Sequence, residues 1–230
     1  MELEIDLLKK NIEEIKKEIK RYSKNPNSVT LVAVTKYFGP EAIEKMHQLG
    51  VKDVGENKGQ AVRDKVSYFK ERGITDIKWH FIGNLQKNKV KYIVEDVSLI
   101  HSVNSFSLAN EINKRAEKLG RCIEILLEIN IAGEESKEGY LYENLIGELE
   151  NYKSLKNIKI KGLMTMAPYT NDENLIRSVF KKLVDIKNEL NKKHFNGELT
   201  ELSMGTSNDY RIALEEGATL IRVGTKLYSR

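Results

Sequence analysis

Two basic residues stand at the ends of apolar segments that are typical of buried strands. Lys36 follows VTLVAVT at 29–35, and Arg222 lies within TLIRV at 219–223. By the two-residue period of a strand, Lys36 shares a face with Val32 and Val34, and Arg222 shares one with Leu220. A lysine that ends a buried strand is desolvated, which lowers the pKa of its amine and favours attack on an aldehyde. From its position alone Lys36 could also simply begin a surface loop, and the sequence leaves both interpretations open.

Hydroxyl-rich turns follow the last two predicted strands. LSMGTSN at 202–208 contains Ser203 and Gly205 and precedes a predicted helix, and in VGT at 223–225 Gly224 admits close backbone approach while Thr225 adds a hydroxyl. Backbone N–H groups before a helix bind anions, and these two loops hold phosphate in many barrel enzymes. The two turns therefore predict an anion site. Residues 207–209 are also suited to capping the following helix, and the two roles are compatible.

Other predicted strand ends carry polar or sulfur-containing side chains. They include Asn57 in GEN at 55–57, His80 in WHF at 79–81, and Met166 in MTM at 164–166. Taken singly these signals are weak, because a strand histidine is more often a hydrogen-bonded core residue and a methionine more often fills the core. No phosphate-binding glycine loop, nucleophile elbow or metal-binding His pair occurs in the sequence, so we predict no metal site.

Hydrophobic periodicity predicts eight alternating strands and helices after one leading helix. The leading helix covers residues 1–24, with apolar residues at steps of three and four. Alternating strands and helices indicate a parallel sheet, and eight units in one chain favour a single (β/α)8 barrel domain over 1–230, with a doubly wound open sheet as the alternative. The predicted strands are 29–35, 53–55, 77–81, 97–101, 122–130 (the longest), 158–164, 198–202 and 219–223. The first of the helices after them begins at 40, and the second follows the strand 53–55 and ends near 72. The remaining helices cover 86–94, 106–119, 141–152, 173–193 and 209–215.

Composition excludes several classes of protein. The 230 residues include 38 Lys and Arg against 34 Asp and Glu, and the signs are mixed along the chain, which argues against nucleic-acid or polybasic membrane binding. The single cysteine, Cys122, can form neither an internal disulfide nor a thiolate zinc site. No segment approaches the roughly 18 apolar residues of a membrane helix, and the acidic start is unlike a signal peptide. We expect a monomer in the cytoplasm.

Seven motifs, taken together and in order, resemble those of the YggS/PROSC family of pyridoxal phosphate homeostasis proteins. They span almost the whole chain, and only Thr206 and Asn208 differ mildly from the usual residues. The motifs are LVAVTK at 31–36, GEN at 55–57, WHFIGNLQKNK at 79–89, NIAGEESKEG at 130–139, GLMTM at 162–166, LSMGTSND at 202–209 and IRVGT at 221–225.

The resemblance implies a barrel like the N-terminal domain of alanine racemase, with pyridoxal 5'-phosphate (PLP) bound as a Schiff base on Lys36. It implies that Arg222 faces the pyridine nitrogen. It further places Ser203, Gly224 and Thr225 at the phosphate and Asn57 and His80 near the ring. Met166 and Gly205 complete the implied cofactor-binding set.

The implied role is intracellular PLP homeostasis, in which the protein holds PLP and delivers it to apo forms of PLP-dependent enzymes without catalysis of its own. An arginine stays cationic and only donates hydrogen bonds, so Arg222 would leave the ring nitrogen unprotonated and carbanions poorly stabilised. Racemases of similar fold take their second base, a tyrosine, from an added domain that we do not find here. The alternatives are a PLP-dependent amino-acid racemase or lyase, a phosphate-binding barrel without PLP, and, on the pI of 8.9 alone, a nucleic-acid binder.

Overall fold

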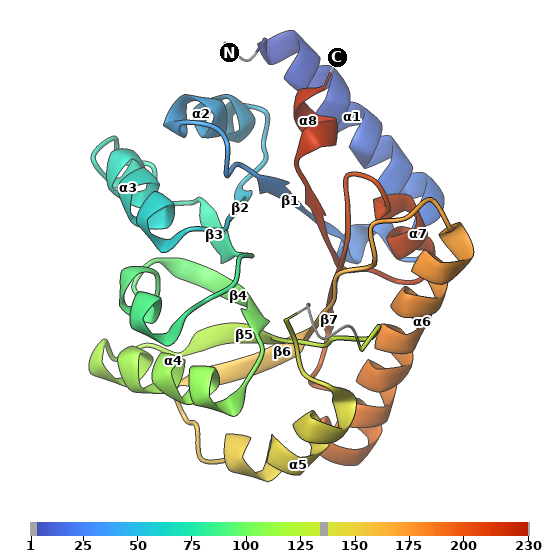
Figure 1. The fold of residues 1–230 in the computed structure, drawn as a ribbon. Coiled ribbons are helices and arrows are strands. Elements are labelled where there is room, and N and C mark those ends of the chain that lie inside the picture. Colours follow the sequence, from blue (N-terminus) through green and yellow to red (C-terminus); the bar gives the residue numbers. More distant parts are fainter. Residues whose placement is uncertain (1–3, 134–137, 230) are drawn as a thin grey trace.

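The computed structural model describes residues 4–133 and 138–229, and its eight parallel strands close into a barrel (Figure 1). Each strand pairs with its sequence neighbours, and β8 pairs with β1 so that Val32 lies opposite Arg222. The predicted barrel is thus confirmed and the open sheet is excluded. The strands are β1 (Thr30–Val34), β2 (Asp53–Glu56), β3 (Lys78–Phe81), β4 (Val97–Val103), β5 (Ile123–Glu128), β6 (Ile158–Met164), β7 (Glu201–Thr206) and β8 (Leu220–Val223).

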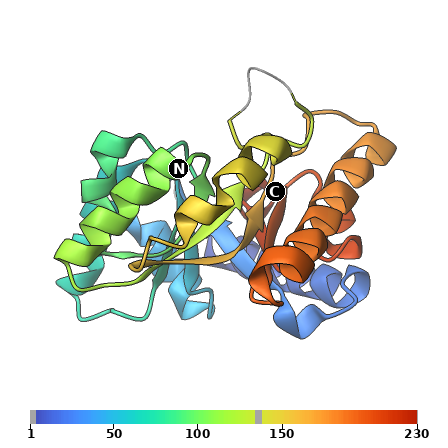
Figure 2. The ribbon, with the colours of Figure 1, turned by 90° about the horizontal axis from the view of Figure 1, so that it is seen from below.

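Helices surround the strands because each helix has one apolar face, which packs against the outside of the barrel. In Figure 2, seen from below, α4 (green) and α6 (orange) lie on opposite sides of the barrel. The helices are α1 (Ile5–Tyr22), α2 (Pro40–Gln48), α3 (Gly59–Lys70), α4 (Phe106–Lys118), α5 (Tyr142–Tyr152), α6 (Glu173–Leu190), α7 (Tyr210–Glu215) and α8 (Thr225–Tyr228), with 3-10 segments η1 (Pro26–Ser28) and η2 (Lys87–Tyr92). No described helix combines the length and apolarity needed to cross a membrane.

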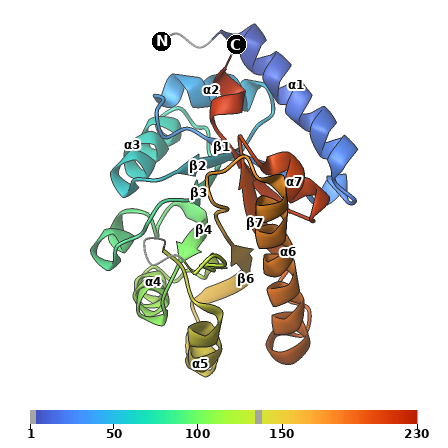
Figure 3. The same ribbon diagram turned by 45° about the vertical axis from the view of Figure 1, so that its right-hand side comes forward.

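The leading helix α1 packs beside α7 and α8, far from it in sequence (Figures 1 and 3). The buried side chain of Asn11 donates from Nδ2 to the carbonyl oxygens of Leu227 and Ser229, at 3.0 and 2.9 Å. Because α8 directly follows β8, α1 fixes the chain just beyond one wall of the barrel mouth.

The barrel interior holds its own apolar layer, separate from the core between strands and helices. This layer consists of Val32, Leu99, Leu126, Met164 and Leu220. Polar side chains are buried as well, namely His80, His101, Ser203 and Arg222. The strand alternation that predicted a shared face for Leu220 and Arg222 therefore matches the register of β8.

Several predicted boundaries differ from the structure. The segment predicted as a helix over 86–94 is only the 3-10 turn η2, in which Val90 alone is buried. Strand β5 ends at Glu128 because the chain then bridges to Tyr140, so β4 and β6, each with 7 residues, are the longest strands. The helix predicted over 173–193 ends at Leu190 and continues as the π-helical turn Asn191–Phe195.

The largest difference concerns β7, which covers Glu201–Thr206 instead of the predicted 198–202. A shift in the β7–β8 register between Ser203 and Thr206 accommodates Gly205, whose φ is +93°. This backbone conformation favours glycine. As a result Ser203 lies inside the barrel, and the turn predicted to start there begins at Ser207.

Candidate functional site

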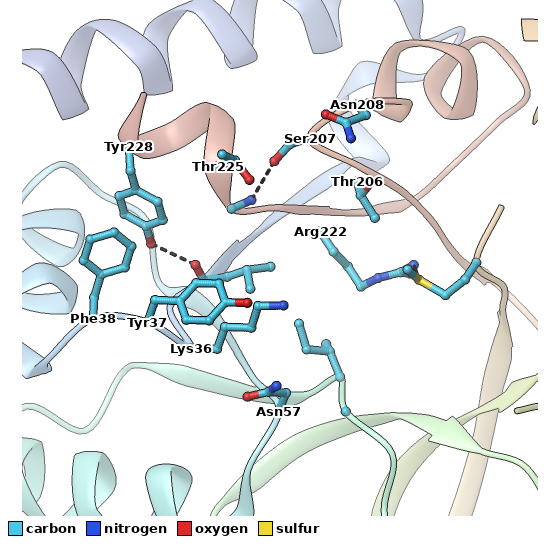
Figure 4. A pocket seen from close by; sticks show the side chains of 15 residues that line it. Lys36, Tyr37, Phe38, Asn57, Thr206, Ser207, Asn208, Arg222, Thr225 and Tyr228 are labelled. Atoms are coloured by element: carbon cyan, nitrogen blue, oxygen red, sulfur yellow. Dashed lines mark hydrogen bonds between the residues drawn. The ribbon is translucent and has the colours of Figure 1, made fainter. Parts of the chain in front are cut away.

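A cavity of about 510 Å³ opens at the carboxyl ends of the strands, where barrel enzymes carry their active sites (Figure 4). Six of the nine predicted site residues line it: Lys36, Asn57, Met166, Arg222, Gly224 and Thr225. The other lining residues are Val34, Tyr37, Phe38, Ile82, Gly83, Thr206, Ser207, Asn208 and Tyr228.

Lys36 extends from the end of β1 into this cavity (Figure 4). Its side chain is exposed, so the predicted desolvation of Lys36 is wrong for the free protein. The amine Nζ lies 4.9 Å from the centre of the Tyr37 ring. An exposed amine at the rim of a cavity is accessible to an incoming carbonyl compound.

The residue before Lys36 is held by a buried ion pair. Glu56 is fully buried, and its Oε1 accepts hydrogen bonds from the Thr35 hydroxyl and from Lys65 Nζ, the latter at 2.5 Å. Lys65 Nζ also donates to the Thr35 carbonyl at 2.9 Å. Thr35 is therefore tied to β2 and α3 by both its side chain and its backbone. These contacts restrict the backbone position from which the Lys36 side chain extends.

Arg222 forms the buried floor of the cavity. Nη1 donates to Ser203 Oγ at 2.5 Å, and Nη2 donates to the Thr165 carbonyl at 3.1 Å and to Met166 Sδ at 2.8 Å. A guanidinium has five N–H donors, so these three hydrogen bonds within the described part of the chain leave two donors for a ligand. Burial lowers the pKa of Arg222 to about 10, against the opposing effect of the Asp209 and Glu128 carboxylates, and the group stays cationic at neutral pH.

A turn rich in hydroxyl and amide donors forms another side of the cavity. Asp209 Oδ1 accepts from the Thr206 backbone N–H and, at 2.9 Å, from its hydroxyl, which closes the turn after β7. Ser207 Oγ accepts from the backbone N–H of Gly224 at 3.0 Å, which joins this turn to the one after β8. A side chain at position 224 would place its Cβ 3.3 Å from Val34 Cβ, so the glycine keeps this corner open.

Three predicted residues, Ser203, Gly205 and His80, do not line the cavity. Ser203 is fully buried behind Arg222, and the hydroxyl beside Gly224 belongs to Ser207. Gly205 lies against α7, where a Cβ would come within 2.6 Å of the Ala213 Cβ. His80 points into the barrel interior, where it contacts His101 and Asp53.

A family model for the N-terminal domain of alanine racemase matches residues 3–230. The pyridoxal phosphate homeostasis protein of Aquifex aeolicus is 41% identical over 96% of this chain and 95% of its own length, and the one from Synechocystis is 38% identical over 88% and 92%. The chain belongs to the family of pyridoxal phosphate homeostasis proteins.

Solved structures agree with this family. PipY of Synechococcus elongatus, a structure with PLP bound, has a TM-score of 0.87 at 32% identity and covers 96% of this chain and 100% of its own. Alanine racemase of Clostridium difficile has a TM-score of 0.74 at 15% identity, over 99% of this chain and 57% of its own. The second likeness shows the shared barrel fold.

Sequence reasoning missed an aromatic wall of the cavity. The rings of Phe38 and Tyr228 lie 3.9 Å apart between centres, and the Tyr228 hydroxyl donates to the Val34 carbonyl at 2.9 Å. Burial, reinforced by the negative charge of Glu56, raises the pKa of Tyr228 far above its ordinary value. The aromatic pair directly after Lys36 was the available signal, whereas Tyr228 follows the last predicted strand and carried none.

Glu128, at the carboxyl end of β5, is a further polar group of the barrel mouth that was not predicted as a site residue. Burial raises its pKa to about 7, although the positive charge of Arg222 opposes the shift.

Glu138 bridges two neighbouring loops by accepting from the side-chain amides of Asn84 and Asn104, each at 2.7 Å. Residues 134–137 of the motif NIAGEESKEG lie outside the described residues. Across 4–133 and 138–229, no group of three His, Cys, Asp or Glu side chains could hold a metal ion.

Proposed function

We propose that this protein binds PLP in the cavity at the barrel mouth and holds it as a Schiff base on Lys36. The observation that carries the proposal is one cavity lined by an exposed lysine amine, a buried guanidinium with spare donors and a turn of hydroxyl and amide groups. PLP has an aldehyde, a pyridine nitrogen and a phosphate. The lysine amine, the guanidinium and the turn provide a partner for each of these groups. The PLP-bound PipY structure and the names of the relatives support the same ligand.

The lining residues fit the three parts of PLP. Ser207, Thr225 and the open corner at Gly224 would hold the phosphate. Arg222 would donate to the pyridine nitrogen, with Met166 beside it, and Asn57 would lie near the ring. In this assignment Ser207 takes the place predicted for Ser203, while Ser203 and His80 act from behind Arg222 and Gly205 shapes the turn.

The role we propose is storage and delivery of PLP. Bound PLP can act as an electron sink when its ring nitrogen is protonated. Arg222 stays cationic at neutral pH and can only donate, so it favours an unprotonated ring nitrogen and works against that chemistry. The exposed amine of Lys36 leaves the linkage open to attack by an incoming amine. The relatives' names as homeostasis proteins are consistent with a carrier that passes PLP to apo-enzymes.

The first experiment is an absorbance spectrum with added PLP, before and after borohydride, followed by peptide mapping. We expect a Schiff-base band and reductive fixation of PLP on the peptide that contains Lys36. Lys36→Ala should abolish both, whereas Lys89→Ala, in the neighbouring depression outside this cavity, should leave both unchanged. Fixation on another lysine would refute the assignment, and phosphate binding without fixation would favour a phosphate-binding barrel.

A second experiment separates a carrier from an enzyme. The PLP-loaded protein is mixed with an apo-enzyme in the presence of a scavenger for free PLP, and recovery of the apo-enzyme's activity is followed. A carrier restores activity that the scavenger denies to free PLP. In parallel, exchange of the α-proton of several amino acids is measured by NMR, and exchange that Lys36→Ala abolishes would favour a racemase or lyase. Sedimentation and localisation measurements test the predicted cytoplasmic monomer.

A further inference from the structure

A chain of buried hydrogen bonds runs through the barrel interior from Arg222 to Asp53. Arg222 Nη1 lies 2.5 Å from Ser203 Oγ, Ser203 Oγ lies 2.8 Å from His101 Nδ1, and His101 Nε2 lies 2.9 Å from His80 Nδ1. The last contact joins His80 Nε2 to Asp53 Oδ1 at 3.0 Å. The five side chains come from β8, β7, β4, β3 and β2, so the chain crosses the barrel from one wall to the other.

The two ends fix the direction of every hydrogen bond between them. The Asp53 carboxylate only accepts, so His80 donates from Nε2, and a neutral His80 then accepts at Nδ1. His101 must therefore donate from Nε2 and accept at Nδ1, and the Ser203 hydroxyl donates to that nitrogen. Ser203 Oγ is then the acceptor for Arg222, which can only donate. Every donor in the chain points from the guanidinium towards the carboxylate.

The surroundings of the chain favour this single arrangement. Ser203 and His101 are fully buried, and Arg222 and His80 are 5% and 4% exposed. Burial, helped by the positive charges of His80 when protonated and of Arg222, holds the pKa of His101 well below its ordinary value, so His101 is neutral at pH 7. The charged groups facing Arg222 from other elements are Glu128 at the end of β5 and Asp209 after β7. Asp53, with a side chain 21% exposed, is the end of the chain nearest solvent.

We propose that Asp53, His80, His101 and Ser203 are positioning residues that hold Arg222 in place as a hydrogen-bond donor to the cofactor. The proposal rests on the proposed function, because the pyridine nitrogen of PLP is the group that Arg222 would meet. Asp53 sets the direction of the hydrogen bonds in the chain. Ser203 Oγ is the acceptor that holds the guanidinium at the other end. A reversed chain would make Ser203 Oγ accept from both Arg222 and His101, which would leave the buried hydroxyl proton without a partner, a costly state.

The direction of the chain can be tested on the free protein by long-range proton–nitrogen NMR of the histidine rings. We expect the ring proton of both His80 and His101 to be on Nε2. Asp53→Asn replaces the carboxylate by an amide that can also donate, which relaxes one of the two ends, so a minor second tautomer of both rings should appear. The control Asp76→Asn removes the carboxylate of the exposed pair with His47 and should change only the His47 signals. The Nδ1–H form of His101 in the wild type, or unchanged tautomers in Asp53→Asn, would overturn the proposal.

The link to the cofactor is tested by PLP titration and by the absorbance maximum of the bound form. Ser203→Ala removes the hydroxyl next to Arg222 and should weaken PLP binding about five- to tenfold, the loss of about one hydrogen bond, and shift the maximum. Ser203→Thr, which restores the hydroxyl, should recover most of the affinity. Leu99→Val trims the same interior without removing a hydrogen-bonding group of the chain and should lower the melting temperature but leave affinity and spectrum unchanged.

The outcomes of these measurements separate the two proposals. A wild-type protein that takes up no PLP would refute the proposed function, and with it the role of Arg222 toward PLP. Normal PLP fixation on Lys36 together with unchanged affinity and spectrum in Ser203→Ala would leave the proposed function standing and overturn the positioning role. Should Ser203→Ala fail to fold, Asp53→Asn, at the end of the chain nearest solvent, is titrated in its place, with an expected loss of affinity of a few fold.

Discussion

The buried pair Glu56–Lys65 should be the most stability-critical ion pair next to the cavity. Glu56 is fully buried and the Lys65 side chain is 9% exposed. Removing one partner of a buried pair leaves an uncompensated charge, which typically costs about 3–5 kcal/mol. In Glu56→Ala, Lys65 would keep, among the described residues, only its bond to the Thr35 carbonyl, and the Thr35 hydroxyl would lose its acceptor. We therefore expect a loss in the upper part of that range in the free energy of unfolding.

The double variant Glu56→Leu with Lys65→Met distinguishes a stranded charge from simple loss of packing. Removing both charges and refilling the volume is often nearly neutral, so the double variant should recover at least about 2 kcal/mol relative to Glu56→Ala. Glu56 Oε2 has no hydrogen-bond partner in the described part of the chain, which strengthens this expectation because part of the desolvation cost of Glu56 is never repaid. The exposed pair Glu150–Lys153 is the control, and Glu150→Ala should cost less than about 1 kcal/mol.

Urea denaturation followed by circular dichroism measures these differences, and borohydride fixation of PLP reports on the position of Lys36. Because the pair holds Thr35, Glu56→Ala should also slow fixation of PLP on Lys36 under conditions where the variant is still folded. A cost below about 1 kcal/mol for Glu56→Ala, or a double variant no more stable than the single one, would refute the reasoning.

Three further perturbations test separate parts of the structure. Gly205→Ala combines a backbone φ of +93° with a Cβ 2.6 Å from Ala213 Cβ, and should lower the free energy of unfolding in urea by about 2–4 kcal/mol. Gly217→Ala, with a φ of +100° and open space around its Cβ, should lower it only by the backbone strain of about 1–2 kcal/mol, and equal costs would refute the steric argument. His101 has a depressed pKa in the folded state, so the unfolded state binds more protons below its ordinary pKa, and stability should fall as pH drops below about 6.5; His101→Phe should reduce this slope by up to about 1.4 kcal/mol per pH unit, and an unchanged slope would contradict it. Tyr228→Phe removes the bond to the Val34 carbonyl but keeps the ring against Phe38, so it should cost about 1 kcal/mol in stability without preventing PLP fixation, and loss of fixation would show a direct role for the hydroxyl.

Strand alternation predicted which residues share a face, but it could not predict where an irregular strand ends. Lys36 follows β1 and Arg222 lies within β8, and both reach the cavity as predicted. Ser203 was placed in a turn because its polar neighbours look like one, yet the irregularity at Gly205 extends β7 to Thr206 and moves the turn to Ser207. A bulge of this kind depends on the register with the neighbouring strand, and the local sequence alone does not determine this register.

The contacts of His80 could not be predicted for a different reason, namely that they depend on closure of the barrel. Alternation places His80 and His101 on the inner face of adjacent strands, and this much is local. Ser203 is on β7, three strands beyond β4, and in an open sheet His101 could not reach it. In the closed barrel the inner faces of β4 and β7 meet across the interior, and His101 Nδ1 comes within 2.8 Å of Ser203 Oγ. The histidine that looked like an isolated core residue thereby becomes the link between Asp53 on β2 and the guanidinium at the floor of the cavity.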